Sequence, residues 1–528
     1  MTKSSPGRGW LYAAGGAALL AALTALPPGA RAQNAPITGQ TSVGPATTVD
    51  LATAPVLPSV PMPAGFTFNR PTMPEAEYRA LQQRGPEAPS ALKTAPRAEA
   101  PGSGLSLVAQ IASVNETSPV TCCGGFPPDG DIATSRDYTV QIVNYAVTML
   151  PLTGGPFKQV SLATFFGDST NFLFDPRIFY DPLWNRFVVL VDSNGSDVHF
   201  AVSTTGDPTG SWFVYTAGLP FNSGDFIDFP QMGMDLNSII ITYNDFLAGG
   251  GFDAKTFAFP KAYFYNGLIQ NVPVFGGSGC TIAPPYVLDN HGPSYTLVAC
   301  PNDNGVFLGP MFNTGLSNVS LTHWQAKVPV TAYSVPPCAP QPGVNYCLET
   351  GDNAFENRSA QIGNRIWNVH EVTVGTATPR WYEFNTDTST LVNDDIWFAT
   401  GTSTDWHPSI VVNGVGAVGA NATGETFGTW MSVDSANNQN LRLRAIGGNG
   451  TVDSAGVGAG IPVGPASATA LTDQTFPDSR HRAGDYSYIS LYPALAGPCQ
   501  ANEWALLEGE VAFNFTNWGT RVAIVRHC

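Results

Sequence analysis

The chain has 528 residues, of which 24 are basic and 40 are acidic, so its formal net charge at pH 7 is −16. Nucleic acids and anionic membranes require a basic protein surface, so this charge argues against both as partners. Charged residues make up only 12% of the chain. Gly, Pro, Ser, Thr and Asn take their place, a composition typical of a turn-rich, exported β protein.

The first 32 residues resemble a secretory signal peptide. Lys3 and Arg8 precede an apolar stretch from Trp10 to Leu26, and Ala30-Arg31-Ala32 fits a cleavage site before Gln33. The alternative is an uncleaved membrane anchor, but the apolar core is short, rich in Ala and Gly, and ends in Pro-Pro. We therefore expect a secreted protein (extracellular, periplasmic or at the cell surface) with no membrane insertion of the mature form.

Residues 33–104 are rich in Pro, Ala, Thr and Ser and show little periodicity. This composition predicts a disordered or extended leader. Within it, Thr72-Met73-Pro74-Glu75 forms a capping box with Pro in the first turn, which predicts a short helix at 73–84.

Residues 105–528 contain short strand-like runs separated by turn signals, and no long amphipathic helix. The runs alternate with period 2 and are rich in β-branched and aromatic residues, as in VQIVNYAVTML, RFVVLVD, VHFAVS, SIIITYNDF and RVAIV. An all-β segment of about 420 residues is too long for one sandwich, so a repetitive closed architecture is favoured.

One type of segment recurs along this region. It begins with an acidic, aromatic or small residue, often followed by Pro, and continues as an alternating strand, as in FDPRIFYD (174–181), DFPQMGMD (228–235), APPYVLDN (283–290), WHPSIVVN (406–413) and AGDYSYIS (483–490). We expect Pro176 to start an inner strand and Pro182 to make the turn into the next strand. The spacing of roughly 50 to 75 residues predicts an all-β fold, a β-propeller of six or seven blades. The alternative is a set of unrelated strands in stacked β-sandwiches. A strand from within 105–150 is expected to complete the last blade beside the C-terminal run NWGTRVAIVRHC.

Eight cysteines in an exported chain indicate disulfides. Pairing of near neighbours predicts Cys280–Cys300, Cys338–Cys347 and Cys499–Cys528, the last of which would fix the closing strand. The adjacent Cys122 and Cys123 would form a strained vicinal disulfide or remain thiols. No C-x-x-C motif occurs, so neither a zinc ribbon nor c-type haem is expected.

Several segments together resemble a group of secreted bacterial proteins with a sialidase-like β-propeller. They span most of residues 120–526 and include PPDGDIATSRDYTVQIVN, DPRIFYDPLWNRFVVL, AVSTTGDPTGSWFVY, DFPQMGMD, RAGDYSYISLYP and NWGTRVAIV. The resemblance implies a propeller fold and export, but no established activity. TGDPTGSW (205–212) is similar to a degenerate Asp-box, which in sialidases is a structural turn.

The candidate site is formed by residues near the starts of the expected inner strands: Asp129, Asp175, Asp228, Asp405 and Asp485. Such starts meet around one mouth of a propeller channel. The carboxylates of Asp175, Asp228 and Asp485 are predicted to bind Ca²⁺, which takes several oxygen ligands. The alternative is that each Asp caps the entry of its own strand.

Four further residues complete the predicted ligand-binding set. Arg177 and Arg482 are expected at the same mouth, and Trp406 and His407 would add a surface on which a sugar stacks; a buried structural role for Trp406 is the alternative. A sialidase needs three arginines, a Tyr-Glu pair and an acidic Asp, and the spacing selects no such set. DSNGSD (192–197) is interpreted as a hairpin turn rather than a calcium loop, and His370-Glu371 lacks the second His of a zinc protease.

The sequence supports three functional hypotheses. The first is a monomeric binding protein that engages a glycan or protein ligand through one face of the ring. The second is an extracellular polysaccharide hydrolase or lyase with paired carboxylates at the mouth of the central channel. The third is a structural surface scaffold.

Overall fold

The structure is a computed structural model that describes residues 33–63, 80, 105–118, 120–121, 127–152, 154–287, 289, 291–324, 327–413, 425–449, 458–472, 480–492 and 504–527. The chain divides into two compact units, Met1–Gln33 and Asn34–Cys528, and all of the described strands and helices lie in the second. The predicted signal peptide and, apart from Ala80, the predicted helix at 73–84 lie outside the described residues.

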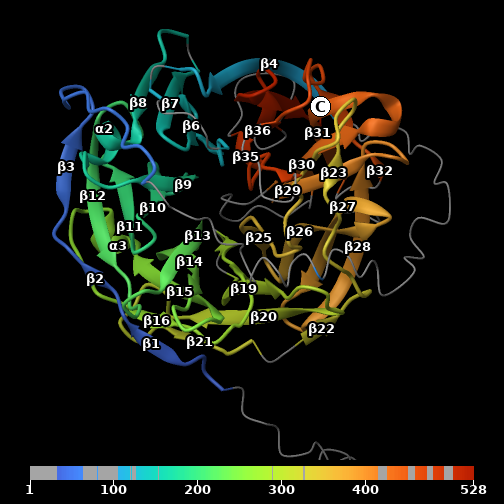
Figure 1. The fold of residues 1–528 in the computed structure, drawn as a ribbon. Helices are drawn as coiled ribbons and strands as arrows, with labels where there is room; N and C mark the ends of the chain where they lie inside the picture. The colour runs from blue at the N-terminus through green and yellow to red at the C-terminus, as the bar shows by residue number, and fades with distance from the viewer. Residues whose placement is uncertain are drawn as a thin grey trace, which may run out of the picture. The chain divides into compact units, whose positions relative to one another are not determined.

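The second unit is a β-propeller, as the sequence predicts, with antiparallel meanders arranged around a central axis (Figure 1). Consecutive inner strands contact each other in chain order and the last contacts the first. These are β5 (Asp131–Thr134), β9 (Leu173–Asp181), β13 (Phe226–Met234), β18 (Pro285–Tyr286), β25 (Ser359–Ile362), β29 (Thr404–Val412) and β35 (Tyr488–Tyr492). The count of six or seven blades stays a prediction, because one eleven-stranded sheet joins the meander that begins with β13 to the meander that begins with β25 through β18.

Each inner strand is followed by strands that lie progressively further from the axis. They are β6 (Tyr138–Val143), β7 (Ala146–Pro151) and β8 (Lys158–Ser161); β10 (Arg186–Ser193), β11 (Asp197–Ser203) and β12 (Ser211–Gly218); β14 (Ser238–Phe246), β15 (Phe252–Pro260) and β16 (Pro273–Phe275); β19 (Ser294–Ala299), β20 (Gly305–Phe312), β21 (Ser320–Leu321) and β22 (Lys327–Pro329); β26 (Arg365–Val374), β27 (Thr376–Asn385) and β28 (Thr390–Phe398); β30 (Glu425–Asp434), β31 (Gln439–Asn449) and β33 (Ile461–Val463); and β36 (Trp504–Ala512) and β37 (Trp518–Arg526).

The remaining elements are short. They are β17 (Ile282–Ala283), β23 (Ala339–Pro340), β24 (Cys347–Leu348), β32 (Gly458–Ala459), β34 (Arg480–His481), the helices α2 (Leu162–Phe166) and α3 (Lys261–Phe264), and the 3-10 turn η1 (Ser435–Asn437). Aromatic and β-branched side chains of neighbouring meanders fill the space between them; Phe200, for example, stacks on Phe259 across two meanders with ring centroids 4.9 Å apart.

Three inner strands carry a β-bulge at the same position, and each bulge contains a proline. In β9, β13 and β29, two residues face a single residue of the next strand: Asp175-Pro176 face Val191, Phe229-Pro230 face Tyr243, and His407-Pro408 face Trp430. The residue before each proline has a positive φ of 49°, 55° and 48°, respectively. A bulge leaves a residue outside the ladder of hydrogen bonds, so the missing N–H of proline is tolerated there.

This geometry corrects one prediction and confirms another. Pro176 does not start its strand but lies inside β9, three residues after Leu173. Pro182 does lie in the turn between β9 and β10, as predicted.

The ring is closed by a strand from the N-terminal side, as predicted. β4 (Ser106–Asn115) pairs antiparallel with β37, the last strand of the chain. Part of the leader is extended and attached rather than flexible: β1 (Ile37–Gln40) pairs with β16, and β2 (Ser42–Val43) and β3 (Thr47–Asp50) pair with β12.

The disulfides Cys280–Cys300 and Cys338–Cys347 are formed as predicted, whereas Cys122, Cys123, Cys499 and Cys528 lie outside the described residues. Asn194 and Gly195, both with positive φ, make the hairpin turn predicted for DSNGSD. In the described part of the chain, no helix is long and apolar enough to cross a membrane.

Candidate functional site

Several of the predicted site residues converge at the axis of the ring. The backbone N–H of Asp485 donates to Oδ1 of Asp129 (2.7 Å), and Arg482 forms an ion pair with Asp485. Asn144 links two strand starts, because its Nδ2 donates to Oδ2 of Asp129 (3.0 Å) and its Oδ1 accepts the N–H of Asp175 (2.9 Å). Asp129, Asp175 and Asp485 are therefore brought close together, while their role as a ligand site stays a prediction.

Electrostatic coupling extends this cluster to Asp228. Burial raises the pKa of Asp129 to about 8 and those of Asp175 and Asp228 to about 7, and the neighbouring carboxylates add to each shift. Arg482 opposes the shift in all three acids. The axis therefore carries an excess of carboxylates in a desolvated environment.

These aspartates also accept local hydrogen bonds, as the alternative interpretation of strand capping expects. Asp129 accepts the N–H of Asp485, and Oδ1 of Asp228 accepts the N–H of Phe229 (2.7 Å). Asp405 accepts hydrogen bonds from the indole N–H of Trp430 (2.8 Å) and from the Ser403 hydroxyl. Asp405 therefore has a structural role in its own blade.

Two predicted ligand-binding residues are enclosed in the protein. Trp406 is fully buried in a hydrophobic cluster with Met431, Val433 and Leu441, so it has the buried structural role that was the alternative and offers no stacking surface. Arg177 is 1% exposed and lies among the rings of Phe229, Tyr486 and Tyr488. Its guanidinium is not available to clamp a ligand carboxylate.

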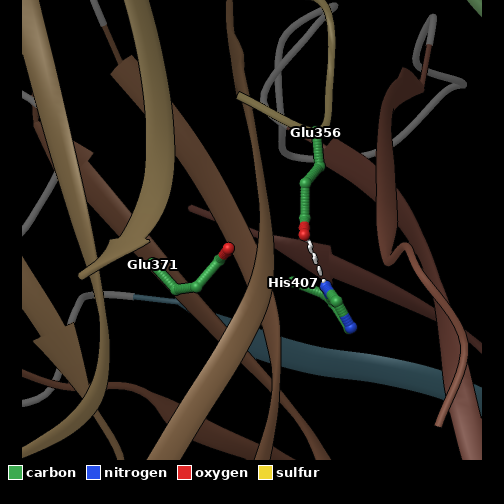
Figure 2. Close-up of side chains that lie close together, drawn as sticks. All are labelled: Glu356, Glu371 and His407. Carbon is green, nitrogen blue, oxygen red and sulfur yellow. Dashed lines mark hydrogen bonds and ion pairs between the residues drawn. The ribbon is translucent and has the colours of Figure 1, made fainter. Parts of the chain in front are cut away.

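A second group of buried polar side chains lies near the axial aspartates. The sequence predicted His407 as a site residue but not its two glutamate neighbours. Glu356, Glu371 and His407 are all buried and offer ligand atoms that lie within 4.8 Å of one another (Figure 2). Nδ1 of His407 is 2.8 Å from both carboxylate oxygens of Glu356. Among the described residues this is the group with metal-like spacing. The metal set Asp175, Asp228 and Asp485 stays a prediction.

Burial governs the protonation of this group. It raises the pKa values of Glu356 and Glu371 well above the usual range of a glutamate and lowers the pKa of His407. No spacing motif could have revealed the group, because Glu356 precedes β25, Glu371 lies in β26 and His407 lies in the bulge of β29.

A narrow pocket opens on the axis at the opposite ends of the inner strands. It is lined by residues such as Thr134, Phe179, Arg358, Ser409 and Leu491 and has a volume of about 70 Å³. Ligand pockets usually measure about 300–1,000 Å³, so this one has room for little more than water.

A much larger groove of about 610 Å³ lies away from the axis. The turns that follow several strands form its walls, and its aromatic lining residues, Trp184 and Phe312, are 41% and 43% exposed. Polar residues complete the lining: Asp235, Asn237, Asp289, His291, Ser294, Asn313 and Thr314. The combination of exposed aromatic rings and fixed polar groups is typical of a ligand site.

Two buried aspartates organise this groove. Oδ1 of Asp181 accepts the N–H groups of Leu183 (3.0 Å) and Trp184 (3.3 Å), while its Oδ2 accepts from Lys261 Nζ (2.6 Å) and the Tyr265 hydroxyl (2.9 Å). The Asp181-Pro182 step thus fixes the turn that presents Trp184.

The second aspartate, Asp235, joins three walls. Its Oδ1 accepts the N–H groups of Asn237 and Ser238 (both 2.8 Å), and its Oδ2 accepts from the hydroxyls of Ser294 (2.9 Å) and Thr314 (2.5 Å). The groove is therefore preorganised by buried hydrogen bonds rather than assembled from independent loops.

Comparison with solved structures finds sialidase-like β-propellers at low sequence identity. The N11 neuraminidase-like protein of A/flat-faced bat/Peru/033/2010 (H18N11) is 11% identical, with 67% of this chain and 96% of that chain covered and a TM-score of 0.36. A protein of unknown function from Dyadobacter fermentans is 10% identical (80% and 99% covered, TM-score 0.33). The exo-β-1,3-galactanase from Phanerochaete chrysosporium, solved with galactose, is 12% identical (61% and 80% covered, TM-score 0.29).

No protein-family model and no curated protein sequence matches the chain. At these identities and TM-scores the similar structures carry no argument about this chain. The function is therefore argued from the groove and the axial groups themselves.

Proposed function

We propose that this protein is an exported, monomeric binding protein that takes a neutral glycan in the groove between Trp184 and Phe312. The observation that carries the proposal is a preorganised groove of about 610 Å³ that exposes two aromatic side chains beside several polar ones. Sugar rings present apolar C–H faces and polar edges, and such a lining matches both.

The orientation of Trp184 supports a stacking role. Its indole packs edge-on against Tyr265, with ring centroids 5.4 Å apart and an interplanar angle of 85°. Because Asp181 also fixes the backbone of the turn, the exposed indole loses little conformational freedom when a ligand binds.

The charges of the groove favour a neutral ligand over an anionic one. Two basic side chains line it: Lys261 is buried and paired with Asp181, and His291 Nε2 is 3.2 Å from Asp387. Both therefore already contact a carboxylate, and the chain as a whole is acidic. An anionic sugar would meet repulsion here without a compensating cation.

Export agrees with the two disulfides of the described chain, since disulfides persist in oxidising compartments. The alternative of a hydrolase or lyase at the channel mouth is less well supported. The acids there, Asp129, Asp175 and Asp228, are at most 6% exposed, and the groove is lined by other residues.

The proposal is tested by affinity electrophoresis and calorimetry of the mature protein with neutral polysaccharides (β-glucan, galactan, xylan) and anionic ones (alginate, pectate). We expect at least one neutral polysaccharide to bind, and Trp184→Ala and Phe312→Ala to weaken that binding about tenfold each, equivalent to about 1.4 kcal/mol.

Phe221→Ala is the matched control, because Phe221 is 39% exposed and lies outside the groove. Binding that survives both groove substitutions would place the ligand elsewhere. A protein that binds only the anionic polymers, or none of the panel, would contradict the proposal.

A further inference from the structure

We propose that Glu356, Glu371 and His407 form a binding site for a first-row divalent cation such as Zn²⁺ inside the ring. The site is separate from the glycan groove and does not depend on the function proposed for it. Figure 2 shows the three side chains approaching from different directions, with the carboxyl group of Glu371 pointing toward the other two.

Each ligand is held by a different part of the propeller. Glu371 comes from the middle of β26, and His407 from the bulge of β29, where its φ of 48° directs the side chain out of the regular strand pattern. Glu356 comes from the segment that leads into β25. An ion at this position would connect two neighbouring meanders.

One carboxylate oxygen of this group is buried without a hydrogen-bond partner among the described residues. It is Oε2 of Glu371, a residue that is 0% exposed. Oε1 of Glu371 accepts one long bond, from the N–H of Asn353 at 3.3 Å. A buried carboxylate oxygen that lacks a donor is unfavourable, and a metal ion would satisfy it.

Acidic neighbours surround the group. Asp352 and Asp485 act electrostatically on Glu356, where Arg177 opposes them, and Arg482 acts on His407. Arg177 is itself enclosed by aromatic rings.

Gly351 leaves the two carboxylates accessible to a shared ion. A Cβ at this position would lie 2.5 Å from Oε1 of Glu356 and 2.6 Å from Oε1 of Glu371, and the residue has a φ of 77°. Any side chain here would therefore occupy the space beside both oxygens. Glycine keeps this wall of the site open.

The donor set selects the kind of cation. Ca²⁺ takes six to eight oxygen ligands and rarely a nitrogen, whereas an imidazole with two carboxylates suits Zn²⁺ and its first-row neighbours. Binding would replace the 2.8 Å contact between Nδ1 of His407 and Glu356. The site thus differs from the predicted Ca²⁺ site of Asp175, Asp228 and Asp485 in both ligands and ion.

The experiment measures metal in the purified mature chain. The protein is unfolded, refolded with one equivalent of Zn²⁺, passed over a desalting column and assayed by plasma mass spectrometry; a parallel sample with Co²⁺ is examined for visible absorption bands. We expect about one ion per chain for the wild type, less than a tenth of that for Glu356→Gln/Glu371→Gln, and a Co²⁺ spectrum with nitrogen and oxygen ligation.

Two controls make the result decisive. Glu508→Gln removes another buried glutamate, and Asp175→Asn/Asp228→Asn removes two of the predicted calcium ligands; both variants should keep the ion. A wild type that retains no more metal than the double glutamine variant overturns the proposal. Metal that persists in the double glutamine variant would also overturn the proposal. If that variant fails to refold, the wild-type content and Co²⁺ spectrum still decide the question.

Discussion

The guanidinium of Arg177 lies over the ring of Tyr486, with its Cζ 3.5 Å from the ring centroid. The Tyr486 hydroxyl donates to Oδ2 of Asp175 (3.0 Å), two residues before that arginine. Nε and Nη2 of Arg177 are buried and donate to no polar partner among the described residues. The aromatic ring therefore supplies much of the compensation for a fully buried cation, and it connects β9 to the segment that leads into β35.

Replacing Tyr486 should separate the contribution of its ring from that of its hydroxyl. We expect Tyr486→Phe to cost about 1 kcal/mol of stability through the lost hydrogen bond. Tyr486→Leu should cost about 3 kcal/mol, because it also removes the desolvated cation–π contact. Urea unfolding followed by tryptophan fluorescence measures both. Equal losses in the two variants would show that the ring adds nothing to the stability of Arg177.

Glu508 should make the stability depend on pH. It is 1% exposed, and burial raises its pKa to about 8, against a weaker opposing effect of the bond from Gln141 Nε2 (3.3 Å). The folded chain thus holds a proton that the unfolded chain releases at lower pH. The free energy of unfolding is then expected to fall as the pH rises from about 4.5 to about 8.

Glu508→Gln should flatten this dependence and raise the melting temperature at pH 8, since each unit of pKa shift corresponds to about 1.4 kcal/mol. Melting curves of both proteins between pH 4 and pH 9 test this. A wild type whose stability rises across this interval, or a variant with an unchanged profile, would contradict the assignment to Glu508.

The sequence predicted the inner strands because their pattern is local. Segments such as 174–181 and 228–235 carry both the alternation and the Asp or Pro that mark their position, and the closing strand was visible for the same reason. The bulge at Pro176 was not visible, because a bulge is defined by the register against β10. Trp406 shows the same limit: its burial depends on residues of β30 and β31, such as Met431 and Leu441.

The sites depend still more on contacts distant in sequence. Asp129 and Asp485 were predicted to meet, and they do so across 356 residues, because both flank inner strands. Glu356, however, belongs to a segment with no repeated pattern, so nothing marked it as a partner of His407. The groove likewise brings Trp184 together with Phe312 from two separate turns. Proximity of this kind follows from the closed ring, which a local pattern does not encode.

The two disulfides should differ in their contribution to stability. Cys280–Cys300 closes a separation of 20 residues and Cys338–Cys347 one of 9. On the chain-entropy account, Cys280→Ser/Cys300→Ser costs about 3 kcal/mol and Cys338→Ser/Cys347→Ser up to about 1 kcal/mol less. Urea unfolding at equal protein concentration provides the comparison. A larger loss from the shorter loop would mean that native packing, rather than loop closure, determines the effect.

Among the N-terminal strands, β4 is the one whose removal should destabilise the protein most, because it closes the ring. Seven residue pairs join β4 to β37, from Gly519 opposite Asn115 to Arg526 opposite Ser106. Without β4, the edge of β37 would present unpaired N–H and C=O groups, which promote association between chains. A chain that starts at residue 119 is therefore expected to aggregate or to lose cooperative unfolding.

A chain that starts at residue 105 is the matched comparison. It keeps β4 but loses the segment that contains β1–β3. These strands pair with the outer strands β16 and β12, and the segment buries few apolar side chains, such as Ala35, Val43 and Leu51. This chain should remain monomeric and unfold cooperatively at a moderately lower temperature. Light scattering and calorimetry compare the association and the melting of the two truncated chains. If both chains behave alike, β4 does not seal the ring, and the stability resides in the meanders alone.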